Sequence, residues 1–389
     1  MKFLKKYLII FTLLLFFISC QNNQLTKIDK YQKIADETIT DTRVEIFDIE
    51  SVDGKIKIKT SNSEVFNKIT NLSDQGIEVH LLPAKDLEKQ SGIINLSVAN
   101  IRKTYRHGSS METQGIFGTP IRIYEKKGSW YRIQTPDNYI GWADGAGVHP
   151  MTDKEIQKWH ESEKVIFTDY NGFVYSGTDC NGDVVSDIVL GNMLKYINKT
   201  GNFYKVEFPD GRLGYIKESQ AELFSKWYNK IELSGDNLVN LSMKFMGIPY
   251  LWGGTSYKAM DCSGFVKTLY QMHGVILQRD ASQQALYGEE VPLVDNYSHL
   301  QKGDLLFFGS EKSITHVGMY IGNMKYIHEA GRVKINSLSK GHLDYSKYRE
   351  SSLVVARRII GSLETKGIET FSSNKFFNQK EVPGSENEH

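Results

Sequence analysis

Cys262, His316 and His328 are the residues whose types and spacing could carry out nucleophilic chemistry. Cys262 lies at the start of a helix-like segment, and the two histidines lie on strand-like segments further along the chain. A thiolate is the attacking form of cysteine, and an imidazole must take the thiol proton and later protonate the leaving amine. A further polar group must hold that imidazole in one orientation and one tautomer. The three residues therefore predict a cysteine peptidase.

The alternation of side chains predicts that the two histidines lie side by side. His316 shares a strand face with Tyr320, and a three-residue loop at 321–323 would pair Tyr320 with Met324. The same register pairs His316 with His328. Directly opposed residues of two antiparallel strands project from one face, with Cβ atoms about 5 Å apart.

The same residue types also have structural and metal-binding uses. A single cysteine at a helix start is often a small buried hydrophobe, and a single histidine is often a structural residue. A zinc site is the main competitor, but the spacings of 54 and 12 residues between the three positions fit no short ligand pattern. His273, His299 and His342 lie in helix-end or polar segments and are expected to face solvent. No metal ligand and no organic cofactor is therefore predicted.

The N-terminus predicts export and lipid attachment. Residues 1–20 contain a basic start, an apolar run and then Ser19-Cys20, which is the organisation of a signal peptide. The apolar run is too short to span a bilayer comfortably. The polar residues after Cys20 make the segment similar to a bacterial lipoprotein signal, in which Cys20 becomes the lipidated N-terminus. The alternative is an ordinary signal peptide. Both place the mature protein outside the cytoplasm, and lipidation would anchor it to the bacterial cell envelope on the periplasmic side.

The remaining cysteines favour a free catalytic thiol. Apart from Cys20, the chain contains Cys180 and Cys262. An oxidising compartment would permit a bridge between them. Cys180, however, lies in a polar turn far along the chain from Cys262, so a free Cys262 is predicted. Because Cys262 opens a helix, the macrodipole is expected to lower its pKa and favour the thiolate.

Length and charge favour several domains and give no sign of a nucleic-acid partner. At 389 residues the chain is expected to hold two to four domains. With 47 basic and 46 acidic residues the net charge is +1, and no basic stripe is found. Residues 21–40 are polar and are expected to form a tether. Strand-like alternation on both sides of Asp53-Gly54 predicts a hairpin, and residues 64–74 predict a short helix.

Short strands dominate the middle of the chain. The first set of predicted strands is Ser97–Arg102, Thr119–Glu125, Trp130–Gln134 and Tyr139–Trp142. A second set is Val165–Asp169, Val185–Leu190, Met193–Ile197, Tyr204–Phe208 and the ending Asp210–Ile216. The two endings are alike, which suggests a duplicated small barrel. The pattern alone supports small all-β modules, and the segments resemble bacterial SH3-like domains. The expected modules are 41–150, which includes an N-terminal extension, and 160–228.

Residues 230–361 predict an α+β domain. A helical face precedes Gly247, and Cys262–His273 is a second helix that Gly274 ends. Strand-like runs follow at Asp304–Phe308, Ile314–Ile321, Lys325–Ala330, Arg332–Leu338 and Leu353–Ile360. Helices followed by an antiparallel meander are an α+β pattern. Residues 362–389 are polar and are expected to be disordered.

The region from about Asp236 to Ile360 resembles the NlpC-type cysteine peptidases. The blocks that carry the resemblance, in order, are Pro249–Ser256, Asp261–Phe265, Arg279–Gln284, Gly303–Phe308 and His316–Gly322. The resemblance implies a papain-like core and a Cys-His-His triad that cuts peptidoglycan stem peptides. The implied fold is two small all-β SH3-like barrels followed by an α+β, papain-like NlpC-type peptidase domain.

The resemblance also assigns roles to residues. Cys262 becomes the nucleophile, His316 the general base and acid, and His328 the orienting residue. Tyr250 matches a tyrosine near the oxyanion site of the family, where it would join the backbone N–H of Cys262.

The SH3-like modules narrow the resemblance to the γ-D-glutamyl-L-diamino acid endopeptidases. These enzymes release L-Ala-γ-D-Glu from the diamino acid, and their first module walls off the groove so that only free N-terminal L-Ala fits. The resemblance implies that six residues bind the substrate at its N-terminal ammonium group and next to it: Glu112, Tyr139, Asp261, Ser263, Asp280 and Ala281. The alternative is that Glu112 is a solvated loop charge and Tyr139 a barrel core residue.

The predicted function is hydrolysis of the γ-D-glutamyl–diamino acid bond in stem peptides with a free N-terminal L-Ala, by a monomer that needs no cofactor. Two alternatives from other classes stay open. One is a wall-binding lipoprotein with an inactive peptidase domain, and the other is an amide-forming transferase on the same core. The intact set of Cys262, His316 and His328 favours the hydrolase.

Overall fold

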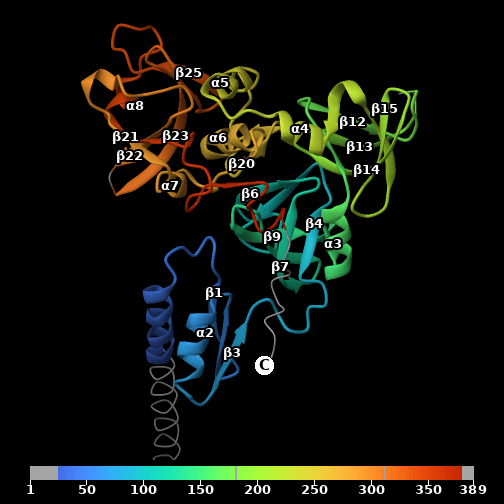
Figure 1. The fold of residues 1–389 in the computed structure, drawn as a ribbon. Helices are drawn as coiled ribbons and strands as arrows, with labels where there is room; N and C mark the ends of the chain where they lie inside the picture. The colour runs from blue at the N-terminus through green and yellow to red at the C-terminus, as the bar shows by residue number, and fades with distance from the viewer. Residues whose placement is uncertain (1–24, 180–181, 311, 379–389) are drawn as a thin grey trace, which may run out of the picture. The chain divides into compact units, whose positions relative to one another are not determined.

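Figure 1 shows the computed structural model of the chain, which describes residues 25–179, 182–310 and 312–378. The predicted signal peptide, Cys20, Cys180 and residues 379–389 lie outside the described residues. The chain divides into two compact units, one ending at Glu88 and the other beginning at Lys89. None of the helices in the described ranges combines the length and the hydropathy that crossing a membrane requires.

The first unit is a three-stranded sheet with two helical segments. Strands β1 (Phe47–Val52), β2 (Lys55–Thr60) and β3 (Ile77–Leu81) are hydrogen-bonded in that order, β2 and β3 in parallel, and helix α2 (Ser63–Thr70) connects these two. Asp53 and Gly54 have φ of 51° and 76°, the left-handed values of a tight hairpin turn, so the predicted hairpin is confirmed.

The structure contradicts the predicted tether, because residues 25–38 are helical. Tyr31, Ala35 and Ile39 recur every four residues and are buried against Ile56 and its neighbours. This spacing places them on one face of a helix, which packs as part of a hydrophobic core. Polar residues on the other faces conceal this short apolar stripe in the composition of the segment.

The second unit begins with two seven-stranded antiparallel sheets. The strands of the first are β4 (Ser91–Ile94), β5 (Val98–Arg102), β6 (Met111–Ile116), β7 (Pro120–Lys127), β8 (Trp130–Gln134), β9 (Ile140–Asp144) and β10 (Val148–Met151). Those of the second are β11 (Lys164–Phe167), β12 (Asn171–Tyr175), β13 (Val184–Val189), β14 (Met193–Thr200), β15 (Phe203–Glu207), β16 (Leu213–Lys217) and β17 (Ala221–Leu223). The predicted strands all fall on these elements, and the sequence missed β4, β6, β10, β12 and β17.

Both sheets have the same strand order. If the strands of each sheet are numbered from one to seven in chain order, their spatial order across the sheet is 7-1-4-5-6-2-3 in both. The short 3₁₀ helices η1 (Gly145–Gly147) and η2 (Glu218–Gln220) precede the last strand of each sheet. Helix α3 (Asp153–Glu161) joins the sheets and begins with a capping box between Thr152 and Glu155.

Helices and a six-stranded antiparallel sheet make up the remainder of the second unit (Figure 1). The helices are α4 (Phe224–Lys230), α5 (Gly235–Met243), α6 (Cys262–Gln271), α7 (Ala281–Gln284), the 3₁₀ turn η3 (Asp295–Tyr297) and α8 (Lys347–Ser351). The sheet contains, in spatial order, β21 (Glu289–Val291), β26 (Leu353–Arg358), β22 (Leu305–Ser310), β23 (Ser313–Gly322), β24 (Lys325–Glu329) and β25 (Val333–Ser337). Short pairs are formed by β18 (Thr255–Ser256) with β19 (Ala259–Met260) and by β20 (Val275–Ile276) with β27 (Glu369–Thr370).

The predicted α+β order of this region is confirmed. Helix α6 packs its apolar side chains, including Phe265 and Leu269, against Val317 and Met319 of β23. Gly274 follows the helix with φ of +78°, the conformation that ends a helix most easily at glycine.

Residues 362–378 contradict the predicted disorder of the C-terminal tail. Strand β27 pairs with β20, and Ile368, Phe371 and Phe376 are buried. The buried Asn374 side chain donates a 2.9 Å hydrogen bond to the carbonyl of Pro136 in the first seven-stranded sheet unit. A few aromatic anchors thus order a segment whose overall composition is polar.

Candidate active site

The local fold explains why Cys262 stands at the first turn of α6. Asp261 is the N-cap, and its carboxylate accepts a 2.7 Å hydrogen bond from the Gly264 N–H. A Cβ at Gly264 would lie 2.0 Å from the carbonyl oxygen of Gly254, so only glycine allows the helix start to approach this loop. Cys262 itself is a free thiol, and it is 7% exposed.

The environment of Cys262 favours the neutral thiol, contrary to the expected effect of the helix macrodipole. The pKa of Cys262 is raised to about 11, mainly by burial and also by the neighbouring Asp261 carboxylate. The backbone N–H groups of Val317 and Ser263 and the Arg279 guanidinium act in the opposite direction. The desolvation of a buried sulfur outweighs these donors and the helix start, so the resting thiol is protonated near pH 7.

The two histidines meet on one strand face, although the predicted register between their strands is wrong. Tyr320 pairs with Tyr326 instead of Met324, because a bulge lies between Tyr320 and Gly322. The shift of two residues brings His328 opposite Gly318. A Cβ added to Gly318 would lie 3.0 Å from the Cβ of His328. A slip of two keeps every side chain on its face. The histidines therefore remain neighbours, with His316 Nε2 2.7 Å from His328 Nδ1.

An amide that the sequence did not reveal fixes the proton positions of this pair. Asn336 on β25 donates from Nδ2 to the carbonyl of Asp344 at 2.6 Å, so its Oδ1 accepts from His328 Nε2 at 2.8 Å. Neutral His328 then accepts at Nδ1 from His316 Nε2. The other ring nitrogen of neutral His316, Nδ1, carries no proton and can accept one.

Both imidazoles are neutral near pH 7. Burial lowers the pKa of His316 to about 2, and the neighbouring His328 adds to this effect. Burial also lowers the pKa of His328 to about 4, against the opposing effect of its bond to Asn336. The site thus holds a protonated thiol at the Val317 N–H and an unprotonated imidazole at the preceding residue, His316.

The pKa of Cys262 makes a prediction for alkylation by iodoacetamide. Because only the thiolate reacts, the rate at Cys262 should rise about tenfold per pH unit from pH 7 to pH 10. N-acetylcysteine is the control, and its rate should level off above its ordinary pKa of about 8.5. Peptide mapping by mass spectrometry identifies the labelled residue. A rate at Cys262 that is already constant near pH 7 would mean a preformed thiolate–imidazolium pair.

Tyr250 lies close to the thiol, and Glu329 lies close to Tyr250 and Asp261. Burial raises the pKa of Tyr250, and negative charge on Cys262, Asp261 or Glu329 acts in the same direction. The Tyr250 backbone N–H donates to the carbonyl of Gly331 at 3.1 Å, which joins the loop to the end of β24. The sequence predicted Tyr250 but gave no signal for Glu329, whose only distinction is its position after His328.

Glu329 is a buried carboxyl without a hydrogen-bond partner among the described residues. Its side chain is fully buried, and neither carboxyl oxygen meets a donor there. The pKa of Glu329 is raised to about 7, because burial, aided by Asp261, outweighs the opposing effect of Lys334. The folded protein therefore holds the proton of Glu329 more tightly than the unfolded chain does.

This proton makes the stability of the protein depend on pH. Between pH 4.5 and about pH 7 an unfolded Glu329 ionises while the folded one stays protonated, so the free energy of unfolding falls as pH rises. The side chain of Glu329→Gln cannot ionise. The free energy of unfolding of this variant, relative to that of the wild type, should therefore rise by about 2 kcal/mol from pH 5 to pH 8. Urea unfolding at both pH values measures this gain. The exposed Glu289→Gln is the control, and an equal gain there would contradict the assignment to Glu329.

Arg279 joins the peptidase site to the first seven-stranded sheet. This buried guanidinium donates to both carboxylate oxygens of Asp261, at 3.1 and 2.6 Å, and to Ser263 Oγ at 2.9 Å. Its Nε donates to Thr113 Oγ1 of β6 at 3.0 Å. Asp261 also accepts from the Gly253 N–H at 2.9 Å, so its charge and its oxygens are satisfied within the protein. The sequence predicted no role for Arg279.

The remaining predicted binding residues come together on the other side of this arginine. Tyr139 donates to Asp280 Oδ2 at 3.2 Å. Burial raises the pKa of Tyr139, and Asp280 and Glu112 add to the effect, which places both carboxylates near its hydroxyl. Glu112 accepts a 2.5 Å bond from Ser110, and Ala281 is buried at the start of α7. The structure therefore brings Glu112, Tyr139 and Asp280 together, and separately ties Asp261 and Ser263 to Arg279.

A helix-borne thiol beside an imidazole pair on an antiparallel sheet defines the protein as a cysteine peptidase. Residues 247–351 match the NlpC/P60 family, and residues 101–147 match the bacterial dipeptidyl-peptidase SH3 domain. The probable endopeptidase NlpC homolog of Haemophilus influenzae is 30% identical over 174 residues, which are 44% of this chain and 78% of that protein. The chain belongs to the NlpC/P60 family and carries an SH3 domain, as the sequence predicted.

Other relatives match more of the chain. The γ-D-glutamyl-L-lysine dipeptidyl-peptidase of Bacillus cereus is 28% identical over 57% of this chain and 68% of its own length. Dipeptidyl-peptidase 6 of Lysinibacillus sphaericus is 27% identical over 64% of this chain and 90% of its own length. A crystal structure of an NlpC/P60 family protein from Bacillus cereus has a TM-score of 0.59 at 24% identity, covering 69% of this chain and 99% of that one. This last likeness concerns the fold.

Proposed function

We propose that the protein hydrolyses the bond between γ-D-glutamate and the diamino acid of peptidoglycan stem peptides that have a free N-terminal L-Ala. The observation that carries the proposal is the hydrogen-bonded chain from His316 through His328 to Asn336, which leaves an unprotonated nitrogen on the base next to a cysteine helix. The names of the relatives from Bacillus cereus and Lysinibacillus sphaericus support the choice of bond.

In the proposed acylation step, His316 Nδ1 takes the thiol proton as the sulfur attacks the carbonyl carbon of the γ-glutamyl group. The Cys262 N–H and the Tyr250 hydroxyl stabilise the oxyanion that forms. The imidazolium of His316 then protonates the leaving amine of the diamino acid, which leaves a thioester on Cys262. His328 and Asn336 hold the base in one tautomer throughout.

Hydrolysis of the thioester repeats these roles. His316 takes a proton from water, whose oxygen attacks the thioester carbonyl, and the second oxyanion forms at the same donors. Collapse of this intermediate breaks the carbon–sulfur bond, and the proton on His316 returns to the sulfur. The product carboxylic acid is L-Ala-γ-D-Glu, and the thiol and base return to their resting states.

The end specificity of the proposed reaction comes from the first seven-stranded sheet together with Asp280 at the start of α7. Glu112 and Asp280 supply two carboxylates around the Tyr139 hydroxyl, where a substrate ammonium group gains charge-assisted hydrogen bonds. Asp261 is already paired with Arg279, so we assign it to holding the helix start and Ser263 in place. Ala281 is buried directly after Asp280, and we assign it to the apolar lining of the same binding site.

The first test of the function is product analysis. Purified protein is incubated with L-Ala-γ-D-Glu-L-Lys and with the diaminopimelate tripeptide, and mass spectrometry follows release of the L-Ala-D-Glu dipeptide. Cys262→Ser should fold as the wild type does and release none. Absence of dipeptide from both substrates with folded wild-type protein would refute the hydrolase, and dipeptide transferred to an added amine instead of water would indicate the transferase.

The free amine makes a quantitative prediction. Acetylating the N-terminal L-Ala removes one charge-assisted contact in a desolvated site and should lower kcat/KM about ten- to a hundredfold. The bulk of the acetyl group against the first seven-stranded sheet should lower kcat/KM further. N-methyl-L-Ala keeps the charge and is the matched control, which should lose much less. The ratio of kcat/KM for free and acetylated tripeptides measures the effect, and a ratio near one would contradict the ammonium site.

The modules outside the peptidase fit this role in the cell envelope. We propose that β11–β17 is a second SH3-like module, since its sheet repeats the strand order of the first. We also propose that the protein is exported as a monomer and anchored by a lipid on Cys20, on the periplasmic side of the envelope. Metabolic labelling with palmitate should mark the wild type and leave Cys20→Ala unlabelled, and equal labelling would exclude this anchor.

A further inference from the structure

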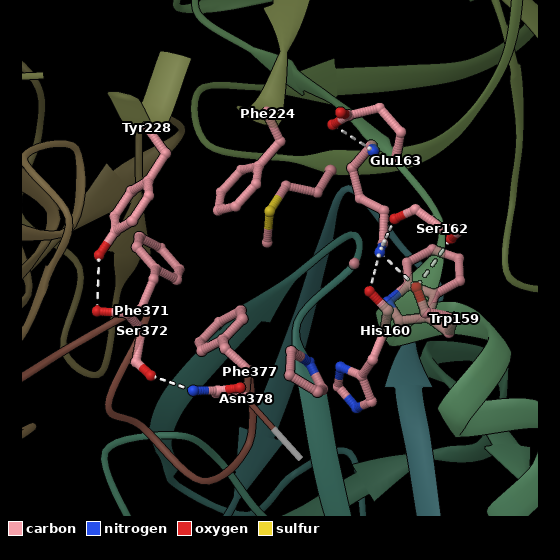
Figure 2. Close-up of a pocket in the computed structure, with 14 residues that line it drawn as sticks. Trp159, His160, Ser162, Glu163, Phe224, Tyr228, Phe371, Ser372, Phe377 and Asn378 are labelled. Atoms are coloured by element: carbon pink, nitrogen blue, oxygen red, sulfur yellow. Dashed lines mark hydrogen bonds between the residues drawn. The ribbon is translucent and has the colours of Figure 1, made fainter. Parts of the chain in front are cut away.

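A cavity of about 290 Å³ lies away from the candidate active site, and none of its lining residues belongs to that site (Figure 2). Its walls come from the end of α3 and the start of β11, from α4, from the turn before β7, and from the C-terminal segment around Phe371. The volume is at the lower end of the range for small-molecule sites, roughly 300–1,000 Å³, so it suits a single ring rather than a chain.

Aromatic rings form one side of this cavity. Figure 2 shows Phe224 and Tyr228 of α4 near Phe371 and Phe377. The rings of Phe224 and Tyr228 are nearly parallel, with centroids 5.7 Å apart and 7° between their planes. Phe371 meets Phe377 edge to face at 4.5 Å. Aromatic walls held by one another in this way present flat, rigid apolar surfaces to a ligand.

The charged groups of the cavity are already paired within the protein. The Lys164 ammonium donates to the carbonyls of Trp159 and Ser162, and to that of His160 at 3.4 Å. The Glu163 carboxylate accepts from the backbone N–H groups of Lys164, at 3.0 Å, and Ser225, at 3.2 Å. Lys164 and Glu163 carry opposite charges, act on each other and make their hydrogen bonds within the protein, so the cavity favours a neutral ligand over an ion of either sign.

Polar groups for such a ligand lie on both sides of the cavity, His160 across from the aromatic rings and two hydroxyls among them. His160 Nε2 is buried and meets no hydrogen-bond partner among the described residues. Burial lowers the pKa of His160 to about 4, and Lys164 acts in the same direction, so the imidazole is neutral. Tyr228 and Ser372, bonded to each other at 3.2 Å, add hydroxyls on the aromatic side. An unpaired buried polar atom is costly, and a ligand hydrogen bond would remove that cost.

We propose that this cavity binds a neutral monosaccharide ring, of the N-acetylhexosamine kind. One face of such a ring carries only C–H groups, which pack on aromatic side chains, and its edge carries hydroxyl and acetamido groups. The rings of the aromatic side match the first, and His160 with the hydroxyls of Tyr228 and Ser372 matches the second. The ring would be recognised apart from the peptide bond that the peptidase cuts.

Saturation-transfer NMR with N-acetylglucosamine on the full chain tests the proposal. We expect saturable binding with a millimolar Kd that is unchanged between pH 5.5 and 7.5, since His160 stays neutral across this range. Glucosamine is the matched probe, and its ammonium group beside Lys164 should weaken binding at least tenfold. No saturable binding of N-acetylglucosamine up to 50 mM, or equal binding of glucosamine, would overturn the proposal.

Variants distinguish this cavity from the peptidase groove. His160→Leu and Phe224→Ala should each weaken binding of N-acetylglucosamine about tenfold, whereas Cys262→Ser and the exposed Phe173→Ala should leave it unchanged. Tyr228→Phe keeps the ring and serves if Phe224→Ala fails to fold, as judged by thermal unfolding. Binding that survives in folded His160→Leu, or that Cys262→Ser abolishes, would place the sugar elsewhere. The readout is binding, so its outcome is independent of whether the tripeptide is hydrolysed.

Discussion

Replacing His316 by alanine should lower kcat/KM for the stem tripeptide by roughly 10⁴-fold or more. The resting thiol is protonated, with its pKa raised to about 11 by burial, so without a base almost no thiolate is present near pH 7. The other imidazole, His328, is held at His316 Nε2 and at Asn336 Oδ1, so we do not expect it to replace the lost base. Initial rates at several tripeptide concentrations measure the loss.

The double variant sharpens this test. His316→Ala and Cys262→Ala remove two members of one catalytic unit, so their combination should cost little more than either alone. His299→Ala is the matched control, because that histidine is half exposed and lies in a loop beside Asp295. Full additivity of the two losses, or a His316→Ala enzyme that keeps a tenth of its activity, would exclude His316 as the base.

The sequence could predict the pairing of the histidines because side-chain alternation in a strand depends only on parity. The register error of two residues came from a bulge between Tyr320 and Gly322, which short-range turn signals do not specify. A shift of one residue would have separated His316 from His328, and a shift of two did not. The prediction of the site thus tolerated an error in the prediction of the fold.

Other parts of the site depend on contacts between distant segments, which local patterns do not contain. Asn336 acquires its place from the pairing of β24 with β25, and Arg279 from contacts with both Asp261 and Thr113. The thiol pKa shows the same limit. The helix start at Cys262 was visible in the sequence, whereas the burial that outweighs the macrodipole is a property of the packed domain.

Arg279 carries the second large effect. Arg279→Leu removes a buried guanidinium and leaves the Asp261 carboxylate, which is 6% exposed, without its opposite charge. Breaking a buried ion pair from one side typically costs about 3–5 kcal/mol, because the remaining charge stays desolvated. We therefore expect the free energy of unfolding to fall by about that amount, and the link to Thr113 of the first sheet to be lost. Urea unfolding followed by circular dichroism measures the change.

A second substitution separates the loss of the pair from the loss of packing. Adding Asp261→Asn to Arg279→Leu removes the stranded charge while an amide oxygen can still accept from the Gly264 N–H, so more than half of the lost stability should return. Arg279→Lys cannot reproduce the bidentate contact and should remain destabilised. The exposed Arg332→Leu is the control, with an expected change within about 0.5 kcal/mol. If Arg279→Leu unfolds at the wild-type urea concentration, the pair does not stabilise the helix start. The position of Cys262 would then depend on Gly254 and Gly264 alone.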